Sequence, residues 1–253
     1  MIQINNISKS FSERKVLNDI SFTFQTGKTN VIIGGSGSGK TVLIRCMVGL
    51  NNIDSGEVLF DGRNFYDLNF KGKKEIRKEI GMLFQGGALF DSKTVEENVV
   101  FPLSMFTDLS ESEKRDRANF CLQRVNLLNA NKLFPSELSG GMKKRVAIAR
   151  AIAVQPKYLF CDEPNSGLDP KTSIVIDNLI KEITEEYEIT TIVITHDMNS
   201  VIEIGDNILF IYNGCKWWEG SKEEILKTDN KEIQDFVYAT KFLKDRKRRF
   251  RVM

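Results

Sequence analysis

The chain has 253 residues, of which 41% are hydrophobic, enough for one sizeable core with an attached subdomain. Its 36 basic and 34 acidic residues leave a formal net charge of +2, so we expect no nucleic-acid partner. No signal peptide opens the chain, and no apolar run approaches the roughly 18–20 residues of a membrane span. The four cysteines form no CxxC pair, which favours reduced thiols in a cytosolic setting.

The N-terminal region predicts antiparallel strands. In VLNDISFTF, residues 16–24, Ile20, Phe22 and Phe24 alternate with polar residues, the period-two pattern of a half-buried strand. TNVIIG, residues 29–34, differs because it is a short, continuous apolar run that ends in glycine. Such a run is typical of a parallel strand covered on both faces.

Residues 86 to about 155 carry little strand signal. SESEKRDRANFCLQRVNLLNA, residues 110–130, has the pattern of an amphipathic helix. We therefore expect a helical subdomain inserted in an α/β core.

Two further apolar runs follow, KYLFCDE (157–163) and TTIVITHD (190–197), and both end in polar residues. They predict parallel strands whose carboxyl ends line a site. Between them, apolar residues at helical spacing predict a helix that crosses over the sheet: Ile176, Leu179, Ile180, Ile183 and Tyr187.

The C-terminal region begins with a predicted hairpin at Asn213-Gly214 and a capping box formed by Ser221 and Glu224. We expect one domain over residues 1–230, followed by a helical and basic extension over 231–253. Its run KDRKRRFR, residues 244–251, holds six basic residues and one acidic residue. Two interpretations stay open: a solvated tail, or a helix that docks on the dimer or a small regulator with its bases toward anionic lipid.

The most specific motif lies in IIGGSGSGKTVLIRCMVGL, residues 32–50, which fits G-x-x-x-x-G-K-[ST] between a strand and a helix. Its backbone N–H groups and the positive end of the helix would cradle phosphates. Lys40 would reach the β- and γ-phosphates, and Thr41 would offer a hydroxyl to Mg²⁺. A flexible Gly/Ser turn would not explain this order of elements. The cradle comprises Gly34, Gly35, Ser36, Gly37, Ser38, Gly39, Lys40 and Thr41.

Two more segments supply candidate catalytic parts. The strand YLFCDE delivers Asp162 as a ligand in the Mg²⁺ shell and Glu163 as the group that polarises an attacking water. In LSGGMKKRVAIARAI, residues 138–152, Ser139, Gly140 and Gly141 begin a helix and form a second anion site. One nucleotide cannot easily use both sites of one small chain, so we predict a homodimer in which each chain donates this motif to the other.

With these motifs in this order, nearly the whole chain resembles the nucleotide-binding subunit of ABC transporters. The resemblance implies an ATPase that uses ATP and Mg²⁺. It also implies a P-loop α/β fold with a mostly parallel core sheet, an N-terminal antiparallel β-subdomain and an inserted helical subdomain. Two departures are Met142 after LSGG and Asn165 in DEPNSGLD, where threonine is commoner.

The resemblance also implies roles for single residues. Phe11 would stack on adenine, Gln85 would link Mg²⁺ to the transport partner, and His196, the only histidine, would sense the γ-phosphate. Asp169, in the D-loop, would reach the ATP of the other chain together with residues 139–141 of its own chain. Structural interpretations stay open: Phe11 as a core aromatic, and Gln85 as ordinary polarity at a strand end.

The sequence GALF after Gln85, together with Met142, resembles the Mla/Mkl branch of the family. That branch implies phospholipid transport in a bacterial envelope, with permease subunits, a small regulatory subunit and a lipid-binding protein as partners. The chain would lie on the cytoplasmic side of the inner membrane, held there by the permease. We expect Leu89, Phe90 and Val95 to be exposed for a permease helix, although packing of the helical subdomain would also explain them.

Three other functions stay open. The first is an ABC ATPase coupled to a membrane protein that signals or remodels the cell wall and transports nothing. The second is a P-loop phosphotransferase, which would have no use for LSGGM. The third is a ribosome-associated or DNA-repair ATPase, which normally carries two cassettes or a long coiled coil.

Overall fold

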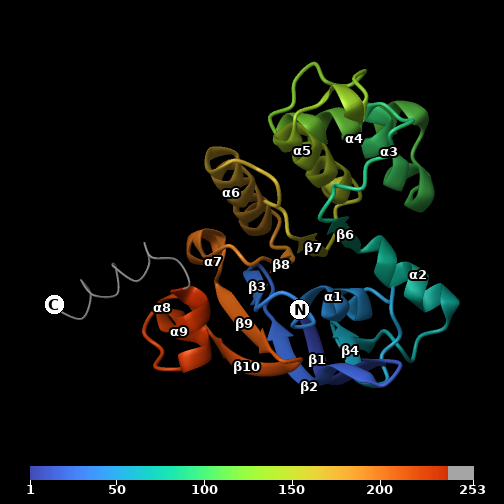
Figure 1. Cartoon of the computed structure of the whole chain (residues 1–253). Coiled ribbons are helices and arrows are strands. Elements are labelled where there is room, and N and C mark those ends of the chain that lie inside the picture. Colours follow the sequence, from blue (N-terminus) through green and yellow to red (C-terminus); the bar gives the residue numbers. More distant parts are fainter. Residues whose placement is uncertain (239–253) are drawn as a thin grey trace.

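Two β-sheets organise residues 1–238, the part of the chain that the computed structural model describes (Figure 1). The smaller sheet is antiparallel and has the order β2-β1-β4-β5. The N-terminal antiparallel strands are thus confirmed. Its strands are β1 (Ile2–Phe11), β2 (Arg14–Phe24), β4 (Ser55–Phe60) and β5 (Arg63–Asn64).

The larger sheet has the order β10-β9-β3-β8-β7-β6 and is parallel except for its edge strand β10. The mostly parallel core sheet is therefore confirmed. Its strands are β3 (Thr29–Ile33), β6 (Ile80–Leu83), β7 (Tyr158–Asp162), β8 (Thr190–Ile194), β9 (Asn207–Tyr212) and β10 (Cys215–Gly220).

The central strands are continuous apolar runs because both faces of the sheet are covered. Along β3, Val31 and Ile33 enter one hydrophobic cluster, while Ile32 enters the other. Alternate residues of a strand point to opposite faces, so a strand between two cores needs apolar residues at every position. The first cluster lies under the helices α3 to α7, and the second lies between the two sheets and α1.

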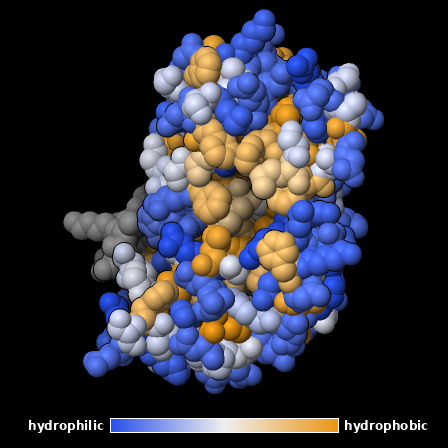
Figure 2. All heavy atoms as spheres, turned by 90° about the vertical axis from the view of Figure 1, so that its right-hand side faces the viewer, coloured by the Kyte–Doolittle hydropathy of each residue, from blue (hydrophilic) through white to orange (hydrophobic). Residues whose placement is uncertain are grey.

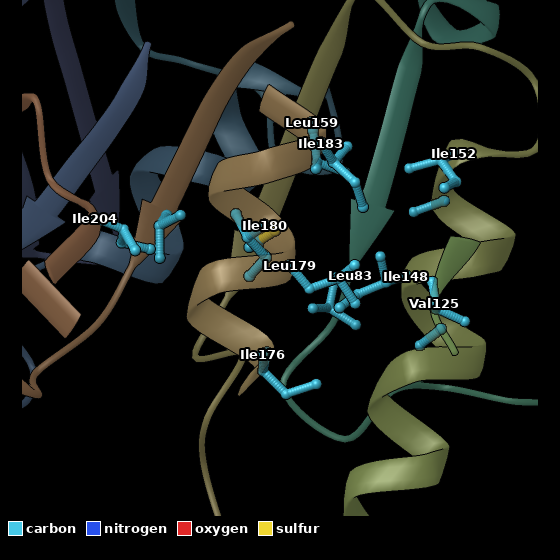
Figure 3. Packing of buried hydrophobic residues seen from close by; sticks show 14 of the residues in the cluster. Leu83, Val125, Ile148, Ile152, Leu159, Ile176, Leu179, Ile180, Ile183 and Ile204 are labelled. Atoms are coloured by element: carbon cyan, nitrogen blue, oxygen red, sulfur yellow. The ribbon is translucent and has the colours of Figure 1, made fainter. Parts of the chain in front are cut away.

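Helices α3, α4 and α5 follow β6 and form a group at one end of the larger sheet in Figure 1, with α5 against β6. Figure 3 shows Ile148 and Ile152 of α5 on the side of Leu83 of β6, with apolar residues of α6 across from them. The helices are α1 (Lys40–Met47), α2 (Phe70–Lys78), α3 (Val95–Phe106), α4 (Glu111–Arg124), the 3₁₀ helix η1 (Pro135–Glu137), α5 (Gly140–Ile152), α6 (Pro170–Glu186), α7 (Met198–Ile204), α8 (Lys222–Ile225) and α9 (Lys231–Val237).

The C-terminal predictions are confirmed as far as residue 238. Asn213 and Gly214 both have positive φ, 50° and 75°, and connect β9 to β10 as a hairpin. Ser221 and Glu224 form the capping box that begins α8. In α9, Ile233 and Val237 are buried in the first cluster. The run 244–251 lies outside the described residues, and the boundary at residue 230 stays a prediction.

Within residues 1–238, no helix combines the length and the apolar character needed to cross a membrane. Cys46, Cys121 and Cys161 are buried, Cys215 is half-buried, and all four are free thiols. Burial raises the pKa of both Cys46 and Cys121 to about 11.

Candidate active site

Three glycines of the loop between β3 and α1 have positive φ, and two of them also lie close to neighbouring atoms. At Gly34, with φ 149°, a Cβ would lie 2.2 Å from the carbonyl oxygen of Ile211. At Gly39, with φ 107°, a Cβ would lie 2.8 Å from Leu17 Cδ2. A side chain at either position would collide with these atoms, so only glycine fits at positions 34 and 39. It then leads directly into α1, whose first-turn N–H groups have no partners within the helix.

Lys40 and Ser38 make this loop a binding site for anions. The ammonium of Lys40 donates hydrogen bonds to the carbonyl oxygens of Gly34 (2.8 Å) and Gly35 (2.9 Å). Burial lowers the pKa of Lys40, while the carboxylates of Glu163 and Asp162 oppose that shift. The hydroxyl of Ser38 is buried and has no hydrogen-bond partner among residues 1–238. A phosphate would supply the missing acceptor for Ser38 and an anionic partner for Lys40.

A cavity of about 270 Å³ opens over this loop, and Arg14 and Val16 of β2 line it together with residues 37–42. Phe11, at the end of β1, pairs with Arg14 across the β1–β2 turn. Its side chain is 46% exposed, so the alternative of a core aromatic is wrong. An exposed ring beside the rim of the cavity fits the expected stacking on a base.

Asp162 and Thr41 meet beside the phosphate loop. Asp162 Oδ1 lies 3.5 Å from Thr41 Oγ1. Burial first, and then the charge of Glu163, raise the pKa of Asp162. A divalent cation would remove this penalty, and hard oxygen donors next to a phosphate cradle are the ligands that Mg²⁺ prefers. The residues present thus fit Mg²⁺.

Gln85 makes a hydrogen bond to a different residue, outside this pair of oxygen donors. Its Nε2 is 3.5 Å from Ser166 Oγ, and no hydrogen bond connects it to Thr41 or Asp162 within residues 1–238. Its assignment as a Mg²⁺ ligand therefore remains an expectation.

Glu163 and His196 come together at the ends of two adjacent strands, β7 and β8. His196 Nδ1 lies 2.8 Å from Glu163 Oε2, and the imidazole is 70% exposed. Glu163 has a φ of 50°, a strained value for a residue with a side chain, and its N–H donates to Ile194 O at 2.9 Å. The parallel order β3-β8-β7 places Lys40, Asp162, Glu163 and His196 at one edge of the sheet, as the sequence predicts.

The predicted second anion site, residues 139–141, lies at the N-terminus of α5. Ser139 is the N-cap, and its hydroxyl accepts a hydrogen bond from Met142 N at 3.3 Å. Within residues 1–238, no hydrogen bond joins residues 139–141 to the phosphate loop. Asp169 caps α6 by accepting from Lys171 N and Thr172 N. Both groups are exposed, so they are free to meet another molecule.

Comparison with known proteins decides the family. The model of the ABC transporter family matches residues 17–166, more than half of the chain. The chain belongs to the ABC transporter family. It is an ATP-binding cassette of that family, which binds ATP with Mg²⁺ and hydrolyses ATP.

Two curated relatives cover nearly all of this cassette. The probable ribonucleotide transport ATP-binding protein mkl of Mycobacterium tuberculosis is 35% identical over 236 residues, which are 93% of this chain and 66% of that protein. The methionine import ATP-binding protein MetN of Campylobacter jejuni is 38% identical over 259 residues, covering 96% of this chain and 77% of that protein. The chain thus spans just under two thirds of the mkl relative.

Solved cassettes share the fold. The dimeric structure of the bacterial ABC transporter cassette MJ0796 superposes with a TM-score of 0.81 at 33% identity, covering 88% of this chain and 99% of that one. The cbiO1 protein of Clostridium perfringens, part of the transporter complex cbiONQ, gives a TM-score of 0.82 at 31% identity, with 95% coverage of both chains.

One expectation about the cassette surface is wrong. Val95 is fully buried, because it is the first residue of α3 and turns into the helical core after the capping box of Thr94 and Glu97. Leu89 is half-buried against the same core, whereas Phe90 is exposed. Figure 2 views the side on which Figure 1 places α2 and α3, and it shows an apolar area across the centre of that face. Exposed apolar side chains of these elements and the segment between them are Phe70, Phe84, Phe90 and Met105.

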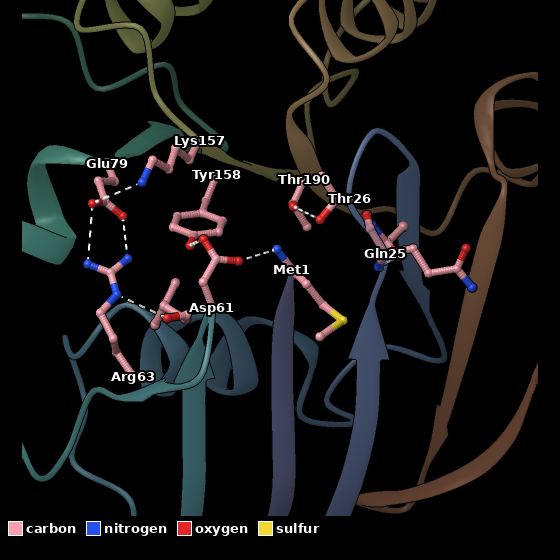
Figure 4. Close-up of polar contacts among 11 residues, drawn as sticks. Met1, Gln25, Thr26, Asp61, Arg63, Glu79, Lys157, Tyr158 and Thr190 are labelled. Atoms are coloured by element: carbon pink, nitrogen blue, oxygen red, sulfur yellow. Dashed lines mark hydrogen bonds and ion pairs between the residues drawn. The ribbon is translucent and has the colours of Figure 1, made fainter.

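A larger cavity, of about 480 Å³, is lined by residues that no nucleotide motif includes. Figure 4 shows Met1, Asp61 and Tyr158 at its wall, joined by the ion pair from the Met1 amine to Asp61 and the hydrogen bond from Tyr158 to Asp61. Its described lining includes basic groups of Met1, Arg117 and Lys157 but no glycine loop at a helix N-terminus. The smaller cavity is the one that the predicted phosphate-binding motif lines, so it remains the expected nucleotide site.

Sequence reasoning missed several polar residues behind the site. Asn165 donates to Ser200 Oγ at 3.0 Å, and both lie next to the buried Asp177 of α6. The ammonium of Lys144 in α5 is buried among backbone carbonyls. These residues belong to no spacing pattern, and only Asn165 stood out, as a departure from the family motif.

Proposed function

We propose that this cassette is the ATPase subunit of a transporter and acts as a homodimer that encloses ATP between two copies. The observation that carries this proposal is the second anion site, which is exposed at the N-terminus of α5 and unconnected to the phosphate loop of its own chain. A site of this kind is used when a second copy brings it to the nucleotide. The dimeric neighbour MJ0796, of which one structure is described as a post-hydrolysis state with ADP and Pi, supports the proposal.

The chemistry proposed for each copy follows from its own residues. The N–H groups of residues 34–41 and the ammonium of Lys40 bind the phosphates, while Thr41 and Asp162 hold Mg²⁺, which neutralises phosphate charge when bound. Glu163 accepts a hydrogen bond from water and orients it for in-line attack on the γ-phosphorus, so that ADP leaves. His196 sits against Glu163, and a protonated ring has donors for both the carboxylate and the γ-phosphate.

Closing of the dimer would complete each site, because Ser139, Gly140 and Gly141 of the partner would donate to the γ-phosphate. Hydrolysis removes that contact and reopens the pair. The permease would follow this cycle through Gln85 and the neighbouring apolar area around Phe84 and Phe90. The cassette would then be held on the cytoplasmic face of the membrane by the permease.

For the cargo, we propose a phospholipid, moved by a permease of the Mla type with a lipid-binding protein and a small regulatory subunit. The support is the GALF segment at residues 87–90 together with Met142 in the signature motif. The relatives' names point to other cargoes, ribonucleotides for mkl and methionine for MetN, at similar identity. Similarity in the ATP-binding cassette therefore does not fix the cargo. The assignment of a phospholipid depends on which permease and lipid-binding subunits accompany this chain.

The test is to purify the complex from its native membrane through a tag on this chain. Mass spectrometry then identifies the subunits and extracted lipids. We expect a multi-span permease and bound phospholipid, and we expect ATP hydrolysis that Glu163→Gln abolishes. A multi-span protein without lipid would remove the phospholipid assignment. Full turnover in Glu163→Gln would overturn the role of Glu163.

A further inference from the structure

Helix α5, which carries the signature motif at its N-terminus, also binds the loop of residues 85–88. The ammonium of Lys144 donates to the carbonyl oxygen of Gln85. One turn and a half further along, the guanidinium of Arg150 donates to the carbonyl oxygens of Gly87 and Ala88, both at 2.7 Å. Two basic side chains of one helix therefore hold three carbonyl groups of one short loop.

Lys144 makes a second contact that Arg150 does not. Its ammonium lies 3.4 Å from the carbonyl oxygen of Glu163, the residue with the strained φ of 50°. The N–H of Glu163 is held from the other side by Ile194 O. The backbone on both sides of this residue is therefore fixed, by β8 through the N–H and by α5 through the carbonyl.

Lys144 is only 5% exposed, although a buried ammonium is costly unless its charge is compensated. Burial lowers the pKa of Lys144, while the nearby Cys161, Asp162 and Glu163 oppose that shift. The two acidic residues of the site thus act on two buried ammonium groups, Lys40 from α1 and Lys144 from α5. A lysine that only formed a salt bridge at the surface would not have to be buried in this way.

We propose that Lys144 is a positioning residue that makes the signature helix, the 85–88 loop and the backbone of Glu163 move as one unit. A shift of the 85–88 loop would then displace both the motif offered to the partner copy and the carboxylate that orients water. The proposal rests on the coupled ATP hydrolysis proposed above, because only in that cycle do these three parts have to move together.

The kinetic experiment compares Lys144→Met, which removes the charge and the donors, with Lys144→Gln, whose amide still has donors for both carbonyls. We expect kcat to fall by about tenfold to a hundredfold in Lys144→Met with KM for ATP nearly unchanged, because misplacement of a water-orienting group affects the chemical step. Lys144→Gln should keep a higher kcat than Lys144→Met. The matched control is Lys181→Met, at a half-buried lysine of α6, which should behave as wild type.

Hydrogen exchange followed by mass spectrometry provides the readout that a general loss of stability would not give. In Lys144→Met, we expect faster amide exchange at residues 86–88 and 164–166 with Tm unchanged or raised, because an apolar side chain can replace a buried charge without loss of stability. An unchanged exchange in both segments would overturn the proposal. So would equal losses of kcat and Tm in the methionine and glutamine variants. If wild type does not hydrolyse ATP, the proposed function fails, while the exchange data still decide the contact.

Discussion

At the scale of single residues, one buried carboxylate behind the site, Asp177, has a raised pKa. Asp177 in α6 is 3% exposed, and in the described part of the chain its Oδ1 has no hydrogen-bond partner. Burial raises its pKa from 3.8 to about 6, Asp197 and Glu203 add to that shift, and hydrogen bonds from Ser200 and Asn165 oppose it. Near neutral pH, the folded chain therefore keeps a buried carboxylate that burial destabilises.

This shift predicts how stability changes with pH. Between about pH 4 and pH 6, the folded protein holds a proton on Asp177 that the unfolded chain has released, so this group's contribution to stability declines as the pH rises. Asp177→Asn removes the ionisable group and therefore the decline in stability that it causes as the pH rises. Urea unfolding at pH 4 and pH 8 should show the variant gaining on the order of 1–3 kcal/mol relative to wild type at the higher pH. The exposed Asp116→Asn should show no such trend, and an equal effect at both pH values would contradict the assignment.

The residues proposed as catalytic could be placed at one sheet edge from the sequence, whereas the buried charged residues behind them could not. Asp162, Glu163 and His196 follow apolar runs, and the carboxyl ends of adjacent parallel strands must meet. Lys144 and Asp177 lie inside helices, where a charged residue ordinarily faces solvent. Only the packing of α5 and α6 on the sheet reveals that these two are buried.

At the scale of elements, the position of α5 depends on close contact with β6. Gly81 of β6 is in ordinary backbone conformation, but a Cβ there would lie 2.4 Å from the carbonyl oxygen of Ala151 in α5. The absence of a side chain thus lets the helix lie directly on the strand that leads to Gln85. This contact complements the hydrogen bonds of Lys144 and Arg150 to the loop of residues 85–88, which follows β6.

A methyl group at this contact should separate the two elements. Gly81→Ala is expected to lower the free energy of unfolding by roughly 1–3 kcal/mol, because the backbone of Ala151 cannot move aside without shifting α5. Gly86→Ala is the matched control, since a Cβ at Gly86 would meet no atom within 4 Å. Chemical denaturation measures both variants, and equal stabilities would show that β6 and α5 are not closely packed in solution.

Elements with a clear period were predictable, and the boundaries that depend on caps were not. The alternation in β2 and the apolar runs of β3, β7 and β8 indicate their burial directly. The error at Val95 has a local cause: Thr94 and Glu97 form a capping box that starts α3, and the first helical residue then faces inward. That T-x-x-E pattern was present in the sequence and would have corrected the expectation.

At the scale of the whole molecule, one copy holds a complete phosphate cradle and an exposed signature motif that does not serve it. The sequence predicts this division because two anion-binding helix N-termini occur in one small chain. It does not predict the cargo, because the nucleotide motifs contain no contact with a transported molecule. The run 244–251, another candidate contact with partners, lies outside the described residues.

The central claim is that a second copy completes the ATP site. Light scattering of Glu163→Gln with ATP and Mg²⁺ tests it most directly, because this variant should bind ATP without releasing the closed pair. We predict a particle of twice the chain mass of 28.8 kDa, which returns to the mass of one chain when Ser139→Arg is added to block the signature motif. A single-chain mass for Glu163→Gln with ATP bound, or a dimer that persists with Ser139→Arg, would contradict the account.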